Sequence, residues 1–284
     1  MPLLAVPNVS AGGDEAIVES IVEAFGAGVL DVHSDVDHNR SVVTLVGEPG
    51  LLAAAVLAGA REALRLIDLR AHAGLHPRVG ALDVAPIVYL EERQRGAACA
   101  EALVLADMLG AELGVPVFLY GALAGGRTRA ELRRGGPEEL ARRLRSGELA
   151  PDFGPDVLDA RSGAVLVAAR PPLIAFNVEL AAPAGLEQAR AIAARIREGG
   201  EQGLPGVRAL GLWLERRGVA QVSTNIEDHR LSSPGEVVRA IARDARIEAV
   251  ELVGLAPAAA LETLPPDLTA RGLRSIEDAL PASA

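Results

Sequence analysis

The sequence predicts an α/β fold of the α+β type, in which two ferredoxin-like split-βαβ subdomains follow one another along the chain. Its 284 residues exceed the usual size of one compact core and suggest two α/β units. Segments with strand and helix patterns interleave, with antiparallel neighbours, which disfavours a single doubly wound sheet. We place the subdomains at residues 1–172 and 173–284.

The first subdomain opens with a strand, a glycine-rich loop and a helix. The apolar run 3–9 predicts the strand. After the loop, Ile17, Ile21 and Phe25 recur at every fourth residue, which predicts an amphipathic helix that ends near Gly26.

The elements that follow complete a βαββαβ order. Two strands are expected at 29–32 and 41–46, joined by a polar loop at 33–40. A helix over 49–66 and a buried strand over 84–90 come next.

The rest of the first subdomain has a helix at 94–113 and strands at 117–120 and 164–169. Between these strands, residues 121–163 are rich in Gly, Arg, Pro and Asp, and a solvated helix is expected near 137–145. A polar connection of this length usually serves a functional site.

The second subdomain repeats the same order of strands and helices. Along its third strand, Gln221, Ser223 and Asn225 share the polar face, which could line a cleft or be the outer face of a half-exposed strand. We expect strands at 173–178, 207–215, 219–226 and 247–255, and helices at 186–197 and 233–246.

The composition favours a globular protein that binds a small molecule. Hydrophobic residues make up 50% of the chain, enough for a sizeable core. The net charge of −10 has the wrong sign for nucleic acid or an anionic membrane, so neither is an expected partner. The single Cys99 fits a reducing compartment, and no signal peptide or membrane-spanning run is found, so we expect a cytoplasmic protein.

Residues 72–83 form the densest cluster of chemically active side chains. Pro77 keeps His76 out of a helix, which disfavours a metal site shared with His72, and no metal is expected. On a loop beside Arg78, His76 could exchange protons near neutral pH, or it could simply be satisfied by backbone hydrogen bonds.

Two other segments could bind a ligand. His38, Asn39 and Arg40 lie at the start of a strand, where the arginine could hold a carboxylate, or where the three could form only a polar loop tip. Residues 150–163 have a turn-rich backbone, which could offer amides to a flat heterocycle or serve only as a linker.

The chain resembles the glutamate formimidoyltransferases in their standalone form, which correspond to the formiminotransferase domain of formimidoyltransferase-cyclodeaminase. The resemblance keeps the family's order of motifs from residue 3 to about 264. Its motifs are 6–10 (Val-Pro-Asn-Val-Ser), Asn39-Arg40, His76-Pro77-Arg78 with 80–83, 150–155 (Ala-Pro-Asp-Phe-Gly-Pro), 173–177, 221–225 and 252–255.

This resemblance implies N- and C-terminal formiminotransferase subdomains with a ligand cleft between them. It implies transfer of a formimidoyl group between N-formimidoyl-L-glutamate and N5 of tetrahydrofolate, a one-carbon step of histidine degradation. Tetrahydrofolate would be the co-substrate, without a metal, and a homodimer is expected.

The resemblance also implies roles for individual residues. His76 falls on the family's catalytic proton carrier, and Arg40, Arg78 and Asn39 are the candidates for binding the anionic substrate. The folate-binding segment falls on Gly154, Pro155, Asp156, Val157, Leu158, Asp159, Ala160, Arg161, Ser162 and Gly163.

Three positions depart from the family. Leu75, His33 and Ala11 stand where relatives have acidic residues, although Asp35 and Asp37 lie near enough in sequence to replace them. Two alternatives follow: a non-catalytic folate-binding or regulatory protein of this fold, and a formyl transferase that uses N-formylglutamate.

Overall fold

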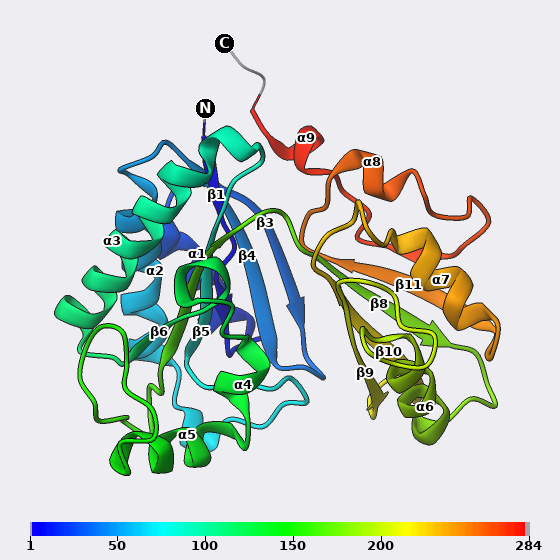
Figure 1. Cartoon of the computed structure of the whole chain (residues 1–284), viewed down its shortest axis with the longest axis horizontal. Coiled ribbons are helices and arrows are strands. Elements are labelled where there is room, and N and C mark those ends of the chain that lie inside the picture. The colour runs from blue at the N-terminus through cyan, green and yellow to red at the C-terminus, as the bar shows by residue number, and fades with distance from the viewer. Residues whose placement is uncertain (1, 282–284) are drawn as a thin grey trace. The chain divides into compact units, whose positions relative to one another are not determined.

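The computed structural model describes residues 2–281 and divides into two compact units, Met1–Pro171 and Pro172–Ala284 (Figure 1). Each unit has its own sheet and its own hydrophobic core.

The sheet of the first unit contains a ferredoxin-like arrangement. The interrupted strand β1/β2 pairs antiparallel with both β4 and β5, β3 pairs with β4, and β7 and β6 extend the sheet in parallel beyond β5. The central order β5–β1/β2–β4–β3 is that of a split βαβ unit, which confirms the predicted fold class. The strands are β1 (Leu3–Ala5), β2 (Asn8–Val9), β3 (Val29–Asp35), β4 (Arg40–Gly47), β5 (Leu82–Val88), β6 (Val117–Leu119) and β7 (Val165–Arg170).

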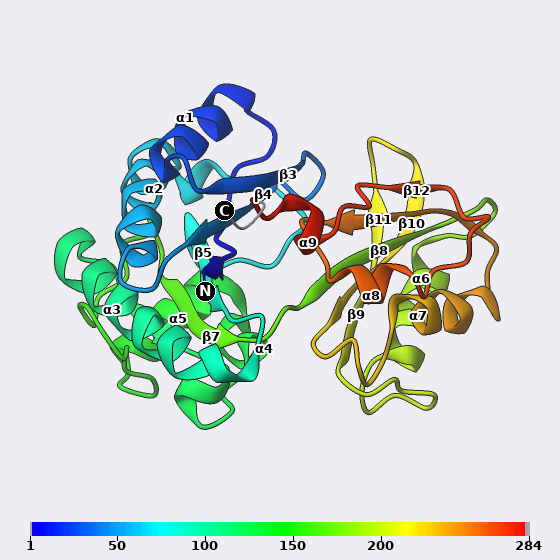
Figure 2. The ribbon, with the colours of Figure 1, turned by 90° about the horizontal axis from the view of Figure 1, so that it is seen from above.

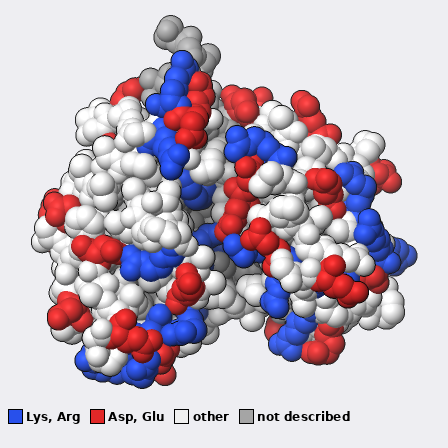
Figure 3. Space-filling model, in the orientation of Figure 1, with Lys and Arg blue, Asp and Glu red and all other residues white. Residues whose placement is uncertain are grey.

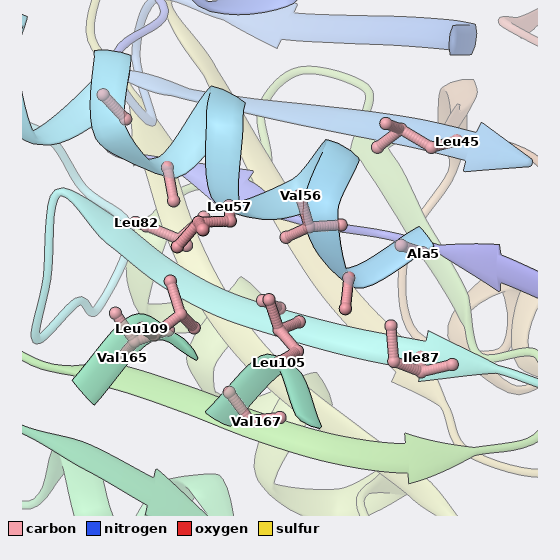
Figure 4. Packing of buried hydrophobic residues seen from close by; sticks show 14 of the residues in the cluster. Ala5, Leu45, Val56, Leu57, Leu82, Ile87, Leu105, Leu109, Val165 and Val167 are labelled. Carbon is pink, nitrogen blue, oxygen red and sulfur yellow. The ribbon is translucent and has the colours of Figure 1, made fainter. Parts of the chain in front are cut away.

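Helices α1 (Glu15–Phe25), α2 (Leu52–Leu66) and α3 (Arg95–Leu113) cover one face of this sheet (Figure 2). Their apolar side chains pack on the strands, as Figure 4 shows for α2 and α3 against β5 and β7. Burial of this apolar surface is the main source of the unit's stability. The packed residues include Val56, Leu57, Leu105, Leu109, Ile87, Val165 and Val167.

The region between β6 and β7 forms two short helices, α4 (Arg129–Arg133) and α5 (Gly136–Arg145). The helix expected near 137–145 is solvated on one side only, because Leu140 and Leu144 pack into a small apolar cluster with Phe118 of β6. Its charged side carries the ion pair between Arg142 and Glu139. Figure 3 shows Arg side chains mixed with Asp and Glu side chains at the foot of the first unit. Short 3₁₀ turns lie at Leu69–Ala71, Glu92–Gln94 and Gly121–Ala124.

The second unit repeats the ferredoxin-like arrangement with the strand order β12-β11-β8-β10-β9. Helices α6 and α7 cover one face of its sheet. Its elements are β8 (Ile174–Leu180), α6 (Leu186–Ile196), β9 (Val207–Leu214), β10 (Val219–Ile226), α7 (Pro234–Ala242), β11 (Ile247–Val253), α8 (Ala258–Leu261), β12 (Ala270–Arg271) and α9 (Ile276–Ala279).

Some boundaries differ from the sequence predictions. The polar stretch 33–35 belongs to β3, because the ladder to β4 is made by backbone groups and the hydroxyls of Ser34 and Ser41 meet at 2.7 Å. The loop predicted at 33–40 is therefore only the turn 36–39. Helix α7 ends at residue 242, four residues earlier than expected, and α4, α8, α9 and β12 were not predicted.

No helix among residues 2–281 has the length and apolar character needed to span a membrane.

Candidate active site

The candidate site lies at one end of the first unit's sheet, where β2 ends and β4, β5 and β7 begin. Three loops meet there: 10–13 after β2, the turn 36–39 before β4, and 72–81 before β5. Helix α4 adds arginines from the long connection between β6 and β7. Residues that are far apart in sequence thus form one cluster.

Asn39 joins these three loops. Its backbone has a φ of +47°, a left-handed conformation that asparagine tolerates better than most residues. Its side-chain oxygen accepts hydrogen bonds from the backbone N–H groups of Gly12 at 2.9 Å and Gly13 at 3.1 Å. Its amide nitrogen donates to the carbonyl of Ala73 at 2.9 Å. Both ends of this amide therefore support the loops.

Arg78 closes the loop that carries His76. Its guanidinium donates to the carbonyl of His72 at 2.7 Å and, more weakly, to that of Gly74 at 3.4 Å. Two of its nitrogens are thus committed to the loop itself, and burial lowers the pKa of Arg78 from its usual value.

Arg40 is the guanidinium best placed to receive an anion. Within residues 2–281 its guanidinium has no hydrogen-bond acceptor and no carboxylate at ion-pairing distance. Burial, with the positive charge of Arg133, lowers its pKa to about 10, while Asp83 and Asp35 act in the opposite direction. Arg40 is therefore charged at neutral pH and has free donors.

Helix α4 places two more arginines near this point. Arg133 forms an ion pair with Asp83, whose other oxygen accepts from the backbone N–H of Val79 at 2.8 Å. Arg129 lies over the ring of Tyr120, with its guanidinium carbon 5.7 Å from the ring centroid. The site is consequently rich in positive charge although the whole chain is acidic.

His76 lies on its loop, half-buried, beside these cations. Burial lowers the pKa of its imidazole well below 6.5, and the nearby charges of Arg40 and Arg133 lower it further. Because this pKa lies below 7, the imidazole of His76 is neutral at pH 7. One of its ring nitrogens is then unprotonated and able to accept a proton.

The low pKa of His76 can be checked by substitution. Replacement Arg40→Met removes the largest of the cationic causes and leaves burial in place, so we expect the pKa of His76 to rise but stay below 6.5. Titration of the ring C–H resonances by NMR measures it. Arg61→Gln, which alters an exposed pair with Glu112, should leave that titration unchanged; an unchanged pKa in Arg40→Met would contradict this account of the site.

The end of the predicted folate segment borders the His76 loop. The backbone N–H groups of Leu69 and Ala81, at the two ends of that loop, donate to the carbonyls of Arg161 at 2.9 Å and Ser162 at 2.8 Å. Gly163 has a φ of +73°, and a Cβ there would lie 2.1 Å from the carbonyl oxygen of Val79, so only glycine fits. Residues 155–157 and 159–161 are exposed, with Val157 exposed by 71%.

Arg129 and Arg133 were not singled out from the sequence. The arginines lie in a stretch whose composition indicates a solvated helix, and the partner of Arg133 is 50 residues away in sequence. No local pattern marks them. His38, by contrast, belongs to the predicted cluster with Asn39 and Arg40, but the sequence indicated no role of its own for it.

The polar face predicted on β10 belongs to the second unit. Gln221 is fully buried, and its amide has no hydrogen-bond partner among the described residues. Glu179, opposite it on β8, is paired with Arg217 and Arg271. Ser223 and Asn225 are half-buried on the same face.

Among residues 2–281, no three His, Cys, Asp or Glu side chains are gathered around one point as ligands of a metal ion would be.

Comparisons with known proteins cover nearly the whole chain. A family model described as the formiminotransferase domain, N-terminal subdomain, matches residues 3–170, and one described as the formiminotransferase domain matches residues 175–264.

Individual relatives agree with these models. The chain is 39% identical over 278 residues to the formimidoyltransferase-cyclodeaminase of Sus scrofa, an alignment that covers 90% of this chain and 50% of that protein. It is 35% identical to the glutamate formimidoyltransferase of Streptococcus pyogenes serotype M1 and 36% identical to that of Thermoplasma acidophilum, covering 90% of this chain and 89% and 88% of those proteins.

The chain thus spans about half the length of the cyclodeaminase relatives and most of the length of the other two. With both formiminotransferase models matched in order along a fold of two ferredoxin-like units, this chain belongs to the formiminotransferase family.

Proposed function

We propose that this protein is a glutamate formimidoyltransferase, which moves the formimidoyl group between N-formimidoyl-L-glutamate and N5 of tetrahydrofolate. The observation that carries the proposal is His76, a neutral imidazole on a loop, beside the free guanidinium of Arg40. The relatives named as glutamate formimidoyltransferases, matched over nearly their whole length, support the same activity.

The transfer needs one proton removed and one delivered. As N5 of tetrahydrofolate attacks the formimidoyl carbon, its N–H proton passes to the unprotonated nitrogen of His76. When the tetrahedral intermediate breaks its bond to the glutamate nitrogen, His76 returns that proton to the leaving amine. One imidazole thus performs both steps.

Arg40 holds a carboxylate of the glutamate moiety in this proposal. Its guanidinium has free donors, and Arg129 and Arg133 increase the local positive potential. Arg78 and Asn39, which we also expected at the substrate, bond to loop backbone, so we assign them the role of holding the His76 loop in place.

Tetrahydrofolate is the proposed co-substrate, bound by the segment 154–163. Its inner end is fixed against the His76 loop, and its exposed part offers backbone amides and the apolar side chain of Val157. No metal takes part in the proposed reaction.

The role of this segment predicts a selective effect of Val157→Ser. Loss of an apolar contact worth about 1.5 kcal/mol should raise the KM for tetrahydrofolate up to about 10-fold and leave kcat unchanged. Val104→Ser, on the exposed side of α3, is the matched control and should leave both constants unchanged. A KM for tetrahydrofolate equal to that of the parent in Val157→Ser would argue against folate contact at this position.

The proposal is tested by following the donor and the product together. The purified chain is incubated with tetrahydrofolate and either formimidoylglutamate or formylglutamate, and both glutamate and the substituted folate are measured. We expect turnover with the formimidoyl donor. Turnover with the formyl donor alone would identify a formyl transferase, and tight folate binding without turnover would identify a non-catalytic binding protein.

We further propose a cytoplasmic homodimer. The single cysteine, which cannot form an intrachain disulfide, supports a reducing compartment. Sedimentation velocity measures the oligomeric state, and a monomer at micromolar concentration would exclude the dimer.

A further inference from the structure

A second imidazole lies beside His76, and the mechanism above does not use it. His38 is in the turn 36–39, its side chain is 2% exposed, and its ring centroid lies 6.5 Å from that of His76. A buried imidazole this close to a proton carrier calls for a chemical explanation.

The backbone fixes the separation of the two rings. Besides the amide of Asn39 described above, the N–H of Leu75 donates to the carbonyl of Asp37 at 3.1 Å, which ties the His76 loop to the turn. Gly74 packs so tightly there that a Cβ would lie 2.5 Å from the carbonyl oxygen of His38. The backbone segments that carry the two imidazoles are therefore held side by side.

A carboxylate holds one side of the His38 ring. Oδ1 of Asp35 accepts from the backbone N–H of His38 at 2.7 Å and lies 2.9 Å from Nδ1 of the ring, at ion-pair distance. A carboxylate beside one ring nitrogen favours the proton on that nitrogen and leaves the other as an acceptor.

Neither ring nitrogen of His38 makes a hydrogen bond to the described residues, although both are buried; Nδ1 has the carboxylate of Asp35 beside it, and Nε2 has no such neighbour. Buried polar atoms in folded proteins nearly always have a partner. Two imidazoles whose centroids are 6.5 Å apart are too far apart for a direct hydrogen bond and suit one bridging water.

Charged side chains surround the two imidazoles. Arg40 of β4 and Arg129 and Arg133 of α4 add positive charge at His76, with Asp83 paired to Arg133. Asp35 of β3 lies at His38. Asp35 also lies opposite Arg40 in the ladder between β3 and β4, so this carboxylate and the three cations surround the two rings together.

We propose that His38 is a positioning residue that sets the tautomer of His76. With its own proton drawn to Nδ1 by the negative charge of Asp35, His38 accepts through Nε2 and one water from the inward N–H of His76. The outward nitrogen of His76 is then the unprotonated one, the form that a general base requires. The effect of this tautomer on catalysis rests on the proposed function, whereas the assignment of the tautomer itself does not depend on that function.

The test reads the His76 tautomer directly, by long-range ¹H–¹⁵N NMR of protein labelled at histidine. We expect one tautomer in the parent and a mixture in His38→Phe, which fills the space without an acceptor. His38→Gln, whose amide oxygen can accept, should restore the single tautomer, and Val36→Ala, an exposed change in the same turn, should match the parent. Asp35→Asn, which keeps the backbone hydrogen bond, gives the mixture if His38→Phe does not fold.

Steady-state transfer kinetics give the second readout. In His38→Phe we expect kcat to fall about 10- to 100-fold and KM to stay within about twofold, with His38→Gln recovering most of the loss. A single His76 tautomer in both His38→Phe and Asp35→Asn would overturn the proposal, whatever happens to the rate. If the parent has no transferase activity but His38→Phe still changes His76 from a single tautomer to a mixture, the proposed function fails and this inference stands.

Discussion

Replacement of His76 by alanine is expected to lower kcat for formimidoyl transfer by about 10² to 10⁴, the range that general acid–base groups contribute. Both proton transfers pass through this imidazole in the proposed mechanism, so its loss leaves only binding and orientation. The side chain is half-buried on a loop and packs into none of the hydrophobic cores, so the fold should be unaffected. Initial rates of folate product formation measure the effect.

His229→Ala is the matched control, because it removes an imidazole from a turn of the second unit that has no part in the proposed site. It should retain parental kcat. Equal far-UV circular dichroism and thermal midpoints would show that both variants fold. A His76→Ala protein as active as the parent would remove His76 from the chemistry.

Replacement of Arg133 by methionine is expected to lower the free energy of unfolding by about 3 to 5 kcal/mol. The carboxylate of Asp83 is almost fully buried and would keep only the backbone N–H of Val79 as a partner. An unpaired buried charge is among the most costly defects in a folded protein. Urea unfolding of parent and variant measures the difference.

The double variant Arg133→Met with Asp83→Asn removes both charges and should recover part of the loss, so the two single effects should not add. Arg142→Met is the surface control: its pairs with Glu139 and Glu148 are solvent-exposed and should contribute less than about 1 kcal/mol. Equal losses in Arg133→Met and Arg142→Met would show that the Asp83 pair is not buried in solution.

The fold could be predicted to a large extent because its periodicities are clear. Helix α1 ends at Gly26, which has a φ of +85°, as the sequence indicated. In β10, Ala220 and Val222 are buried on the apolar side, as their alternation predicted. Local chemistry decides these features, so a local pattern reveals them.

Other elements follow from tertiary contacts and could not be predicted locally. The polar residues 33–35 extend β3 because β4 offers backbone partners along its whole length. Helix α5 buries Leu140 and Leu144 against Phe118, a contact that composition alone does not show.

The candidate site was predictable in part. The loop carrying His76 was identified because Pro77 excludes a helix there and because a family motif coincides with it. The support roles of Asn39 and Arg78 emerged only from their bonds to the carbonyls of Ala73 and His72. Side-chain type suggested substrate binding, but geometry decides which donors remain free.

The sequence indicated even less about the arginines of α4. Arg129 and Arg133 reach the site because the connection between β6 and β7 returns to the start of β5. Nothing in the spacing of these residues indicates that return, and pairing across 50 residues is a property of the fold.

A crystal structure with folate product and glutamate bound tests the central claim most directly. We expect a ring nitrogen of His76 to lie within about 2.6 to 3.2 Å of a nitrogen bonded to the transferred carbon, or to contact that nitrogen through one bridging water. It also predicts a glutamate carboxylate on the guanidinium of Arg40. Ligands bound elsewhere, with the His76 ring out of hydrogen-bond reach of both nitrogens, would contradict it.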